Sequence, residues 1–111
     1  SQVVLVLDLS GQRDTVEEVL GLAYGISKLF LKEYTPVRLL VWDALEYDFI
    51  EVLIQKREEI DTQFIYLLRR AVVTDNIELA KMVQSLRPQL QVYAVIGLYE
   101  DGVRGEVISH G

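Results

Sequence analysis

Apolar residues along the chain follow two periods, one typical of buried strands and one of amphipathic helices. Residues 3–7, VVLVL, form a continuous aliphatic run, which is typical of a strand covered by helices on both faces. Residues 16–30 carry apolar side chains at helical spacing, and acidic residues crowd the first turn, where the helix dipole favours negative charge. The pattern predicts a strand and then a helix that is capped by Asp14 or Thr15 and continues to about Glu33, before a Thr-Pro pair ends it.

The middle of the chain carries a weaker pattern. VRLLVW, residues 37–42, predicts a second strand that runs parallel to the first, because a helix connects them. Residues 46–60 favour a helix, although residues 49–54 are also compatible with a strand. An apolar stretch predicts a strand somewhere within residues 64–73.

The last third of the chain predicts a helix, a strand and a hairpin. The helix follows Thr74-Asp75-Asn76 and buries a stripe of Ile77, Ala80, Val83 and Leu86, with Leu79 and Met82 beside it. A strand is predicted over residues 91–98. The Asp101-Gly102 pair then predicts a hairpin turn with a short returning strand near residues 107–108.

Together these elements predict a single α/β domain over residues 1–111. We expect a three-layer, Rossmann-like sandwich with a mostly parallel sheet of about four or five strands. Helices would cover both faces, and the C-terminal hairpin would form an antiparallel edge. Gly21 and Gly25 lie inside the first helix, where we expect them to allow close packing of the helix on the sheet.

Composition narrows the classes of function. Seventeen acidic and eleven basic residues give a net charge of −6, which repels a phosphate backbone and argues against nucleic-acid binding. No apolar run approaches the roughly 20 residues that cross a bilayer, so we expect no membrane insertion. The chain has no cysteine, which excludes thiolate zinc sites and thiol nucleophiles and fits the cytoplasm. No secretory signal pattern opposes that location.

Residues whose side-chain oxygens could bind a metal ion stand directly after three of the predicted strands. Asp8 and Ser10 follow the first strand, Asp43 follows the second, and Thr74 and Asp75 follow the third. Because ligands of a parallel α/β sheet bind beyond the carboxyl ends of its strands, these residues are candidate ligands at one common rim. Hard oxygen ligands favour Mg²⁺ over zinc. The same residue types also end strands and cap helices without any ligand, because their oxygens accept hydrogen bonds from free backbone N–H groups.

Three segments together resemble the von Willebrand factor A domain: VVLVLDLSGQ, VRLLVWDA and RAVVTDNIELAKMVQSLRPQLQVYAVIGL. That family usually has Asp-x-Ser-x-Ser after its first strand and Thr-Asp-Gly after a later one. The resemblance implies a doubly wound domain whose Mg²⁺ lends a coordination position to the carboxylate of a protein partner. It also implies that Asp8 and Ser10 are ligands and that Asp75 is the later aspartate. The chain departs from the family at Gln12 and Asn76, which stand where the family has serine and glycine.

These observations favour a small, non-catalytic protein-interaction module with a divalent-cation site at the rim. The sequence has no glycine-rich nucleotide loop and no Gly-x-Ser-x-Gly elbow, so it favours a non-catalytic protein over an enzyme without deciding between them. One alternative is a structural or engineered α/β domain with no ligand. Another is a flavodoxin-like domain that binds a small anion at helix N-termini. The predicted edge strand at residues 103–109 also allows a homodimer to form through the sheet.

Overall fold

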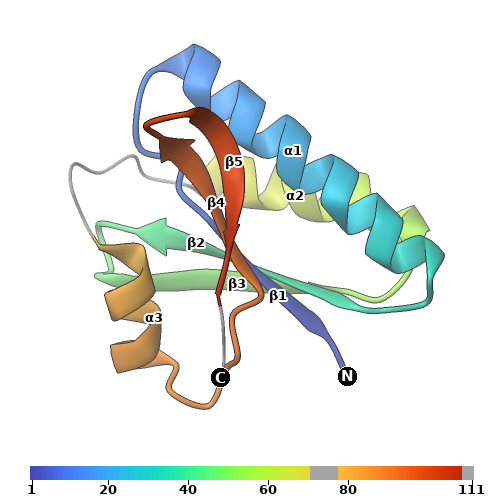
Figure 1. Ribbon diagram of the computed structural model, residues 1–111. Coiled ribbons are helices and arrows are strands. Elements are labelled where there is room, and N and C mark those ends of the chain that lie inside the picture. The colour runs from blue at the N-terminus through green and yellow to red at the C-terminus, as the bar shows by residue number, and fades with distance from the viewer. Residues whose placement is uncertain (71–77, 109–111) are drawn as a thin grey trace.

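A computed structural model describes residues 1–70 and 78–108 of the chain (Figure 1). A short 3₁₀ turn, Arg57–Glu59, precedes the second helix. The helices and strands follow in this order: β1 Val3–Leu7, α1 Arg13–Lys32, β2 Val37–Asp43, β3 Asp48–Ile54, α2 Ile60–Arg70, α3 Leu79–Leu86, β4 Ala94–Tyr99 and β5 Gly102–Val107.

The strands form one mixed five-stranded sheet in the order β3-β2-β1-β4-β5. The central strand β1 runs parallel to β2 and to β4, whereas β3 and β5 are antiparallel to their neighbours and form the two edges. The predicted α/β class and the C-terminal hairpin are therefore confirmed. The prediction of a mostly parallel sheet is corrected to a mixed sheet, because each edge strand returns through a hairpin rather than through a helix.

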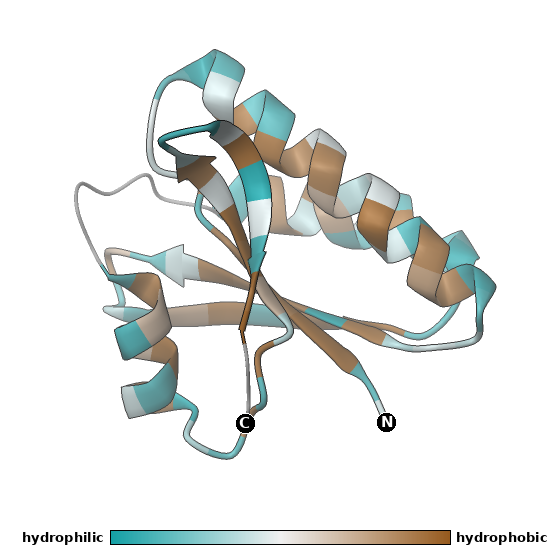
Figure 2. Ribbon diagram, viewed as in Figure 1, coloured by the Kyte–Doolittle hydropathy of each residue, from teal (hydrophilic) through white to brown (hydrophobic). Residues whose placement is uncertain are grey.

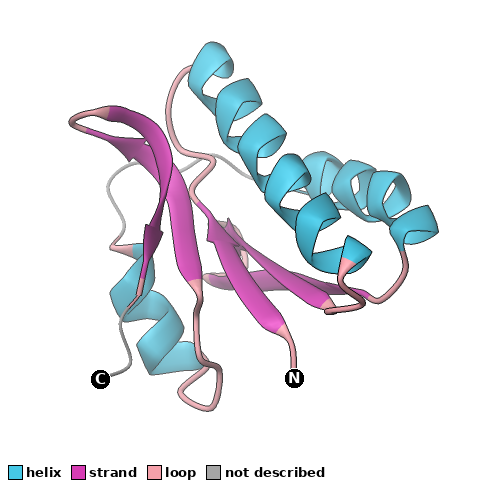
Figure 3. Ribbon diagram, turned by 45° about the vertical axis from the view of Figure 1, so that its right-hand side comes forward, coloured by secondary structure: helices cyan, strands magenta, loops and turns pink. Residues whose placement is uncertain are grey.

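Helices lie on both faces of the sheet, with α1 and α2 on one face and α3 on the other (Figure 3). Successive side chains of a strand point to opposite faces, so β1 contributes to both cores. Leu5 and Leu7 pack in the core beneath α1 and α2, while Val4 and Val6 pack in the core beneath α3. Figure 2 shows the resulting pattern, with hydrophobic residues along the strands and polar residues on the outer sides of the helices.

The prediction for residues 45–70 is wrong in two places. The segment predicted as a helix over 46–60 contains β3, which pairs with β2 along its full length. The segment predicted to hold a strand within 64–73 is helical as far as Arg70, and residues 71–73 lie outside the described part of the chain. Ile60, Phe64 and Leu67 are the buried residues of α2, and their spacing is helical.

Helix α1 was predicted well over most of its length but not at its start. Its N-cap is Gln12 rather than Asp14 or Thr15, and the side chain of Gln12 makes no capping hydrogen bond. Gly21 and Gly25 do not serve close packing, because a Cβ added at either position would have no heavy atom within 4 Å among the described residues.

The C-terminal end of α1 is a two-bond cap that depends on Tyr34. Tyr34 has a φ of 58° and donates its N–H to the carbonyl of Leu31, while Thr35 donates to the carbonyl of Phe30. These two bonds form a Schellman motif, in which the left-handed position usually holds glycine.

The stripe predicted for helix α3 is confirmed at Val83 and wrong at Ala80. Leu79 and Val83 are buried, with Met82 and Leu86 packed beside them, whereas Ala80 is exposed. Ile77 lies outside the described residues. Within residues 1–70 and 78–108, no helix is long and apolar enough to cross a membrane.

Candidate functional site

Asp8 and Ser10 form a closed local unit at the carboxyl end of β1. The backbone N–H of Ser10 donates to Asp8 Oδ1 at 3.0 Å, and the Ser10 hydroxyl donates to the same oxygen. The backbone N–H of Asp8 donates to the carbonyl of Ile96 at 2.8 Å, which extends the pairing of β1 with β4. One carboxylate oxygen of Asp8 therefore stabilises the turn that leads to α1, as the ligand-free alternative predicts.

Gly97 on β4 lies directly beside Asp8, and the sequence did not single it out. A Cβ added at Gly97 would lie 3.0 Å from the Cβ of Asp8 and 3.4 Å from its Oδ2. The missing side chain thus leaves room for the carboxylate at this position. A strand glycine often marks such a close approach, which is the signal that could have identified it.

Asp43 is the last residue of β2 and stabilises a separate turn. Its Oδ1 accepts hydrogen bonds from the backbone N–H of Leu45 at 3.0 Å and of Glu46 at 3.4 Å. These bonds hold the connection from β2 to β3.

Asp8 and Asp43 lie at the ends of neighbouring strands, but their side chains point to opposite faces of the sheet. Leu7 pairs with Val41 across β1 and β2, and both side chains lie in the core beneath α1 and α2. Asp8 is one residue beyond that pair and Asp43 is two residues beyond it. Because strand side chains alternate, the register directs Asp8 toward the face of α3 and Asp43 toward the face of α1.

The remaining two predicted ligands, Thr74 and Asp75, lie outside the described residues. Across residues 1–70 and 78–108, no three His, Cys, Asp or Glu side chains are grouped so that they could hold a metal ion. Only Asp8 and Ser10, of the predicted set, are brought into contact in the part of the chain that is described.

A cluster of four charged side chains connects α3 to the edge strand β3. Glu51 accepts hydrogen bonds from Arg38 and from Arg87, each at 2.9 Å, and Arg87 also lies 3.1 Å from Asp48. Burial alone would raise the pKa of Glu51, but its hydrogen bonds with Arg87 and Arg38 hold it below the ordinary value of 4.5. A backbone hydrogen bond from Phe49 and the contact with Arg87 likewise lower the pKa of Asp48.

The cluster has matched charges, with two arginines and two carboxylates in contact. Mutual pairing leaves no excess charge to attract an ionic ligand, so we assign the cluster a structural role. It joins the end of α3 to β3 across the edge of the sheet.

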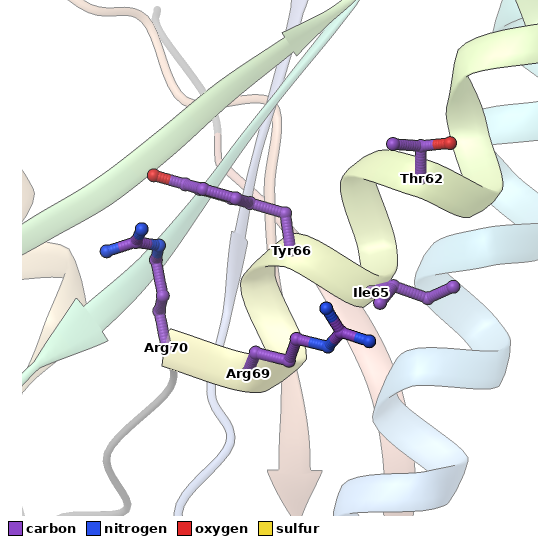
Figure 4. Close-up of a pocket in the computed structure, with 5 residues that line it drawn as sticks. All are labelled: Thr62, Ile65, Tyr66, Arg69 and Arg70. Atoms are coloured by element: carbon purple, nitrogen blue, oxygen red, sulfur yellow. The ribbon is translucent and has the colours of Figure 1, made fainter.

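A pocket lies against α2, and Figure 4 shows the side chains that line it. All five lining residues come from that one helix: Thr62, Ile65, Tyr66, Arg69 and Arg70. The guanidinium carbon of Arg70 lies 4.6 Å from the centre of the Tyr66 ring. Both arginines lie in the last turn of α2, where a positive charge stabilises the negative end of the helix dipole.

An apolar groove runs between α1 and the edge strand β5. It is lined by Leu22, Ile26, Leu29, Phe30, Lys32, Glu33, Tyr93, Ala94, Val103, Arg104, Gly105 and Val107. Leu29 and Val107 are 66% and 61% exposed, which is high for aliphatic side chains beside a core. The rings of Phe30 and Tyr93 meet edge to face at 5.4 Å and form one part of the groove wall.

Backbone hydrogen-bonding groups of β5 point away from β4 at the edge of the sheet, beside this groove. The Ile96 carbonyl accepts the N–H of Asp8 at 2.8 Å, so Ile96 directs its backbone groups toward β1, and its pair with Gly105 on β5 is a non-hydrogen-bonded pair. Hydrogen-bonded and non-hydrogen-bonded pairs alternate along an antiparallel ladder. The N–H and C=O groups of Val103, Gly105 and Val107 therefore point away from β4, and no described strand pairs with them.

No protein-family model matches the chain, and comparisons with curated proteins and with solved structures found no match either.

Proposed function

We propose that this chain is a small, non-catalytic protein-interaction module that binds an extended strand at the free edge of β5. The observation that carries the proposal is the combination of outward-pointing backbone groups with an apolar groove beside them. An added strand would gain main-chain hydrogen bonds from Val103, Gly105 and Val107. Its alternate side chains would enter the groove beside α1, which supplies specificity in this mode of recognition.

The groove favours apolar side chains in the bound strand. Its α1 wall is made by four apolar residues, Leu22, Ile26, Leu29 and Phe30, while Lys32 and Glu33 lie at one end. Full burial of one aliphatic side chain contributes about 1.5–3 kcal/mol, so two such contacts would account for a large part of a micromolar affinity, about 8 kcal/mol.

A displayed library of random heptapeptides, selected against the full chain, tests this proposal. We expect enriched peptides to alternate apolar and polar residues and to bind the Gly105→Ala variant as well as they bind the original chain. Alanine keeps the N–H of residue 105, and its Cβ would meet Ile96 and Ala94 at ordinary contact distances of 3.6 and 3.7 Å.

Gly105→Pro is the matched variant that should lose binding. Proline removes the outward N–H of residue 105 but no hydrogen bond to β4, and edge strands tolerate proline. Val107→Pro applies the same change nearer the end of β5 if the first variant unfolds. Selected peptides that bind the folded proline variants undiminished would refute the proposal.

The rim predicted as a cation site is a second, separate element of the proposed function. Its support is the sequence pattern and the resemblance to the von Willebrand factor A domain. The described residues add none, because Asp8 and Asp43 hold separate turns. Titration calorimetry with Mg²⁺ on the full chain, on Asp8→Asn and on Asp75→Asn tests it. We expect binding heat that both substitutions reduce, and no heat from the original chain would refute the cation site.

The flavodoxin-like alternative receives little support from the start of α1. Asp14 lies in the first turn of that helix, followed by Glu17 and Glu18, and these carboxylates repel an anion. No observation favours anion binding at this position over the stabilisation of the helix itself.

A further inference from the structure

The occupant that best fits the free edge of β5 is a second copy of the same strand. We propose that two chains form a symmetric dimer by antiparallel pairing of β5 with β5, with Gly105 of each chain at the twofold axis. This inference rests on the proposed function, because it names the strand that the edge binds. It is carried by the register of charged and apolar residues along β5.

The register follows from the outward-pointing residues. In an antiparallel pair centred on Gly105, that residue lies opposite its own copy, and Val103 of each chain lies opposite Val107 of the other. All three residues direct their N–H and C=O groups outward, so each opposed pair can exchange two hydrogen bonds. No other residue of β5 needs to change its bonding to β4.

The same register makes the charged residues of β5 complementary. Arg104 of each chain lies opposite Glu106 of the other, on the face away from α1. Directly opposed charges of unlike sign stabilise a pair of strands, and like charges destabilise it. A register shifted by two residues would place Glu106 or Arg104 opposite its own copy, so the charges select pairing about Gly105.

The apolar face of β5 is also self-complementary. Val103, Gly105 and Val107 share the face of α1, because Gly105 borders Ile96 and Ala94 in that core. Directly opposed residues of a sheet have their side chains on the same face, so the two grooves would lie on one side of a continuous sheet. The valines and Leu29 of each chain would then cover apolar surface that is exposed in the single chain.

Gly105 suits the position on the axis. The two copies of residue 105 face each other directly, and two side chains there would lie above the same stretch of sheet. Neither glycine adds a side chain, so the paired valines on either side determine the contact.

Sedimentation equilibrium on the full chain, at concentrations up to about 1 mM, would detect even a weak dimer. We expect the original chain to dimerise. Arg104→Glu and Glu106→Arg should each weaken the dimer by roughly tenfold or more, because each places two pairs of like charges across the axis. The double variant restores both unlike pairs and should recover the original affinity within about threefold.

Asp101→Asn is the control for changes within the hairpin. Arg104 contacts Asp101 at 2.9 Å, so Arg104→Glu also removes that local pair. Asp101→Asn removes the same pair without altering the cross-strand charges, and the dimer should be unaffected. If Arg104→Glu unfolds, Glu106→Arg alone provides the like-charge test, with circular dichroism confirming its fold.

Two results would overturn the inference. A double variant that stays as weak as the single variants would refute the register, and an original chain that is monomeric throughout would refute self-pairing. The second result leaves the proposed function intact if the heptapeptide selection still yields strands that depend on the N–H of residue 105. Loss of both would refute the proposed function as well.

Discussion

Arg87 joins the end of α3 to the edge strand β3, and its removal should measurably destabilise the fold. Its Nε lies 2.9 Å from Glu51 Oε1, and a terminal nitrogen lies 3.1 Å from Asp48 Oδ1. Arg38 holds the second oxygen of Glu51 at 2.9 Å. Arg87→Met keeps most of the aliphatic part of the side chain and removes both ionic contacts. We predict that this variant folds with a lower free energy of unfolding.

The exposure of the partners sets the size of the effect. The side chains of Arg87 and Glu51 are 20% and 29% exposed, whereas that of Asp48 is 48% exposed. Fully exposed ion pairs contribute about 0–1 kcal/mol, and hydrogen bonds to charged groups contribute about 1.5–3 kcal/mol. Glu51 keeps its bond with Arg38, so the loss should be about 1–2 kcal/mol, or roughly 4–8 °C in Tm for a chain of this size.

Urea unfolding followed by the fluorescence of Trp42 measures this loss. Trp42 is the single tryptophan of the chain and is only 4% exposed, so its emission reports the core beneath α3. Arg13→Met is the matched control, because it removes an Arg–Glu pair whose side chains are 91% and 64% exposed. We expect the control to stay within about 0.5 kcal/mol of the original chain.

The dependence of this difference on pH gives a second test. Hydrogen bonds within the cluster lower the pKa of Glu51 and of Asp48 in the folded state. A lowered carboxylate pKa contributes stability that is present above the unfolded pKa and is lost as the pH falls through the folded value. The gap between the original chain and Arg87→Met should therefore narrow as the pH falls below about 4.5. A gap below about 0.5 kcal/mol at neutral pH, or one that persists in acid, would refute the reasoning.

Four further substitutions test the local structure by the same unfolding assay. Ser27→Ala should stabilise the fold by about 1 kcal/mol, because the buried Ser27 hydroxyl has no hydrogen-bond partner among the described residues; unchanged stability would contradict this. Tyr34→Gly should raise the free energy of unfolding by about 0.5–1 kcal/mol, because Tyr34 has a φ of 58° and its side chain is 94% exposed. A lower free energy of unfolding would show that the tyrosine ring contributes more stability than the backbone strain costs. Gly97→Ala should cost about 1–3 kcal/mol because its Cβ would press on Asp8, whereas Gly21→Ala in open space should gain about 1 kcal/mol; equal effects would contradict the close approach.

The elements that could be predicted from the sequence are those whose signals are local. β1 and β2 are covered on both faces, so β1 is a continuous aliphatic run and β2 is largely apolar, and α1 has a long stripe at helical spacing. The hairpin signal is equally local: Glu100 and Asp101 connect β4 to β5, and Gly102, which pairs with Tyr99, has a positive φ of 114° that favours glycine. Each of these signals is complete within a few residues, so no tertiary contact was needed to interpret it.

β3 and α2 could not be assigned in the same way, because their patterns depend on contacts elsewhere in the chain. β3 is an edge strand whose residues contact both cores. Its Glu51 accepts hydrogen bonds from Arg38 on β2 and from Arg87, the residue that follows α3. Its sequence therefore lacks the strict alternation of a strand that is exposed on one face. In α2 the exposed Ile65, Tyr66 and Leu68 lie beside the buried stripe and obscure its helical spacing.

The rim illustrates a second limit, which is register. The sequence correctly suggests that Asp8 and Asp43 lie at the ends of neighbouring strands. The face to which each side chain points depends on how many residues separate it from a pair of opposed residues in the two strands. Leu7 and Val41 are paired, and the two aspartates lie one and two residues beyond them. Moving either aspartate by one residue relative to that pair would place both side chains on the same face of the sheet. Carboxylates that follow adjacent strands are therefore not sufficient evidence of a shared ligand site.

At the edge of β5 the same alternation works in favour of a site. Backbone hydrogen bonding and side-chain direction both alternate with a period of two along an antiparallel strand, so every residue with an outward N–H has its side chain on one face. In β5 that face carries Val103, Gly105 and Val107 beside the apolar groove, while Arg104 and Glu106 lie on the other. An added strand therefore meets apolar contacts on one face and charges on the other. The apolar face can supply affinity without selecting a register, and the charged face selects the register without contributing much affinity.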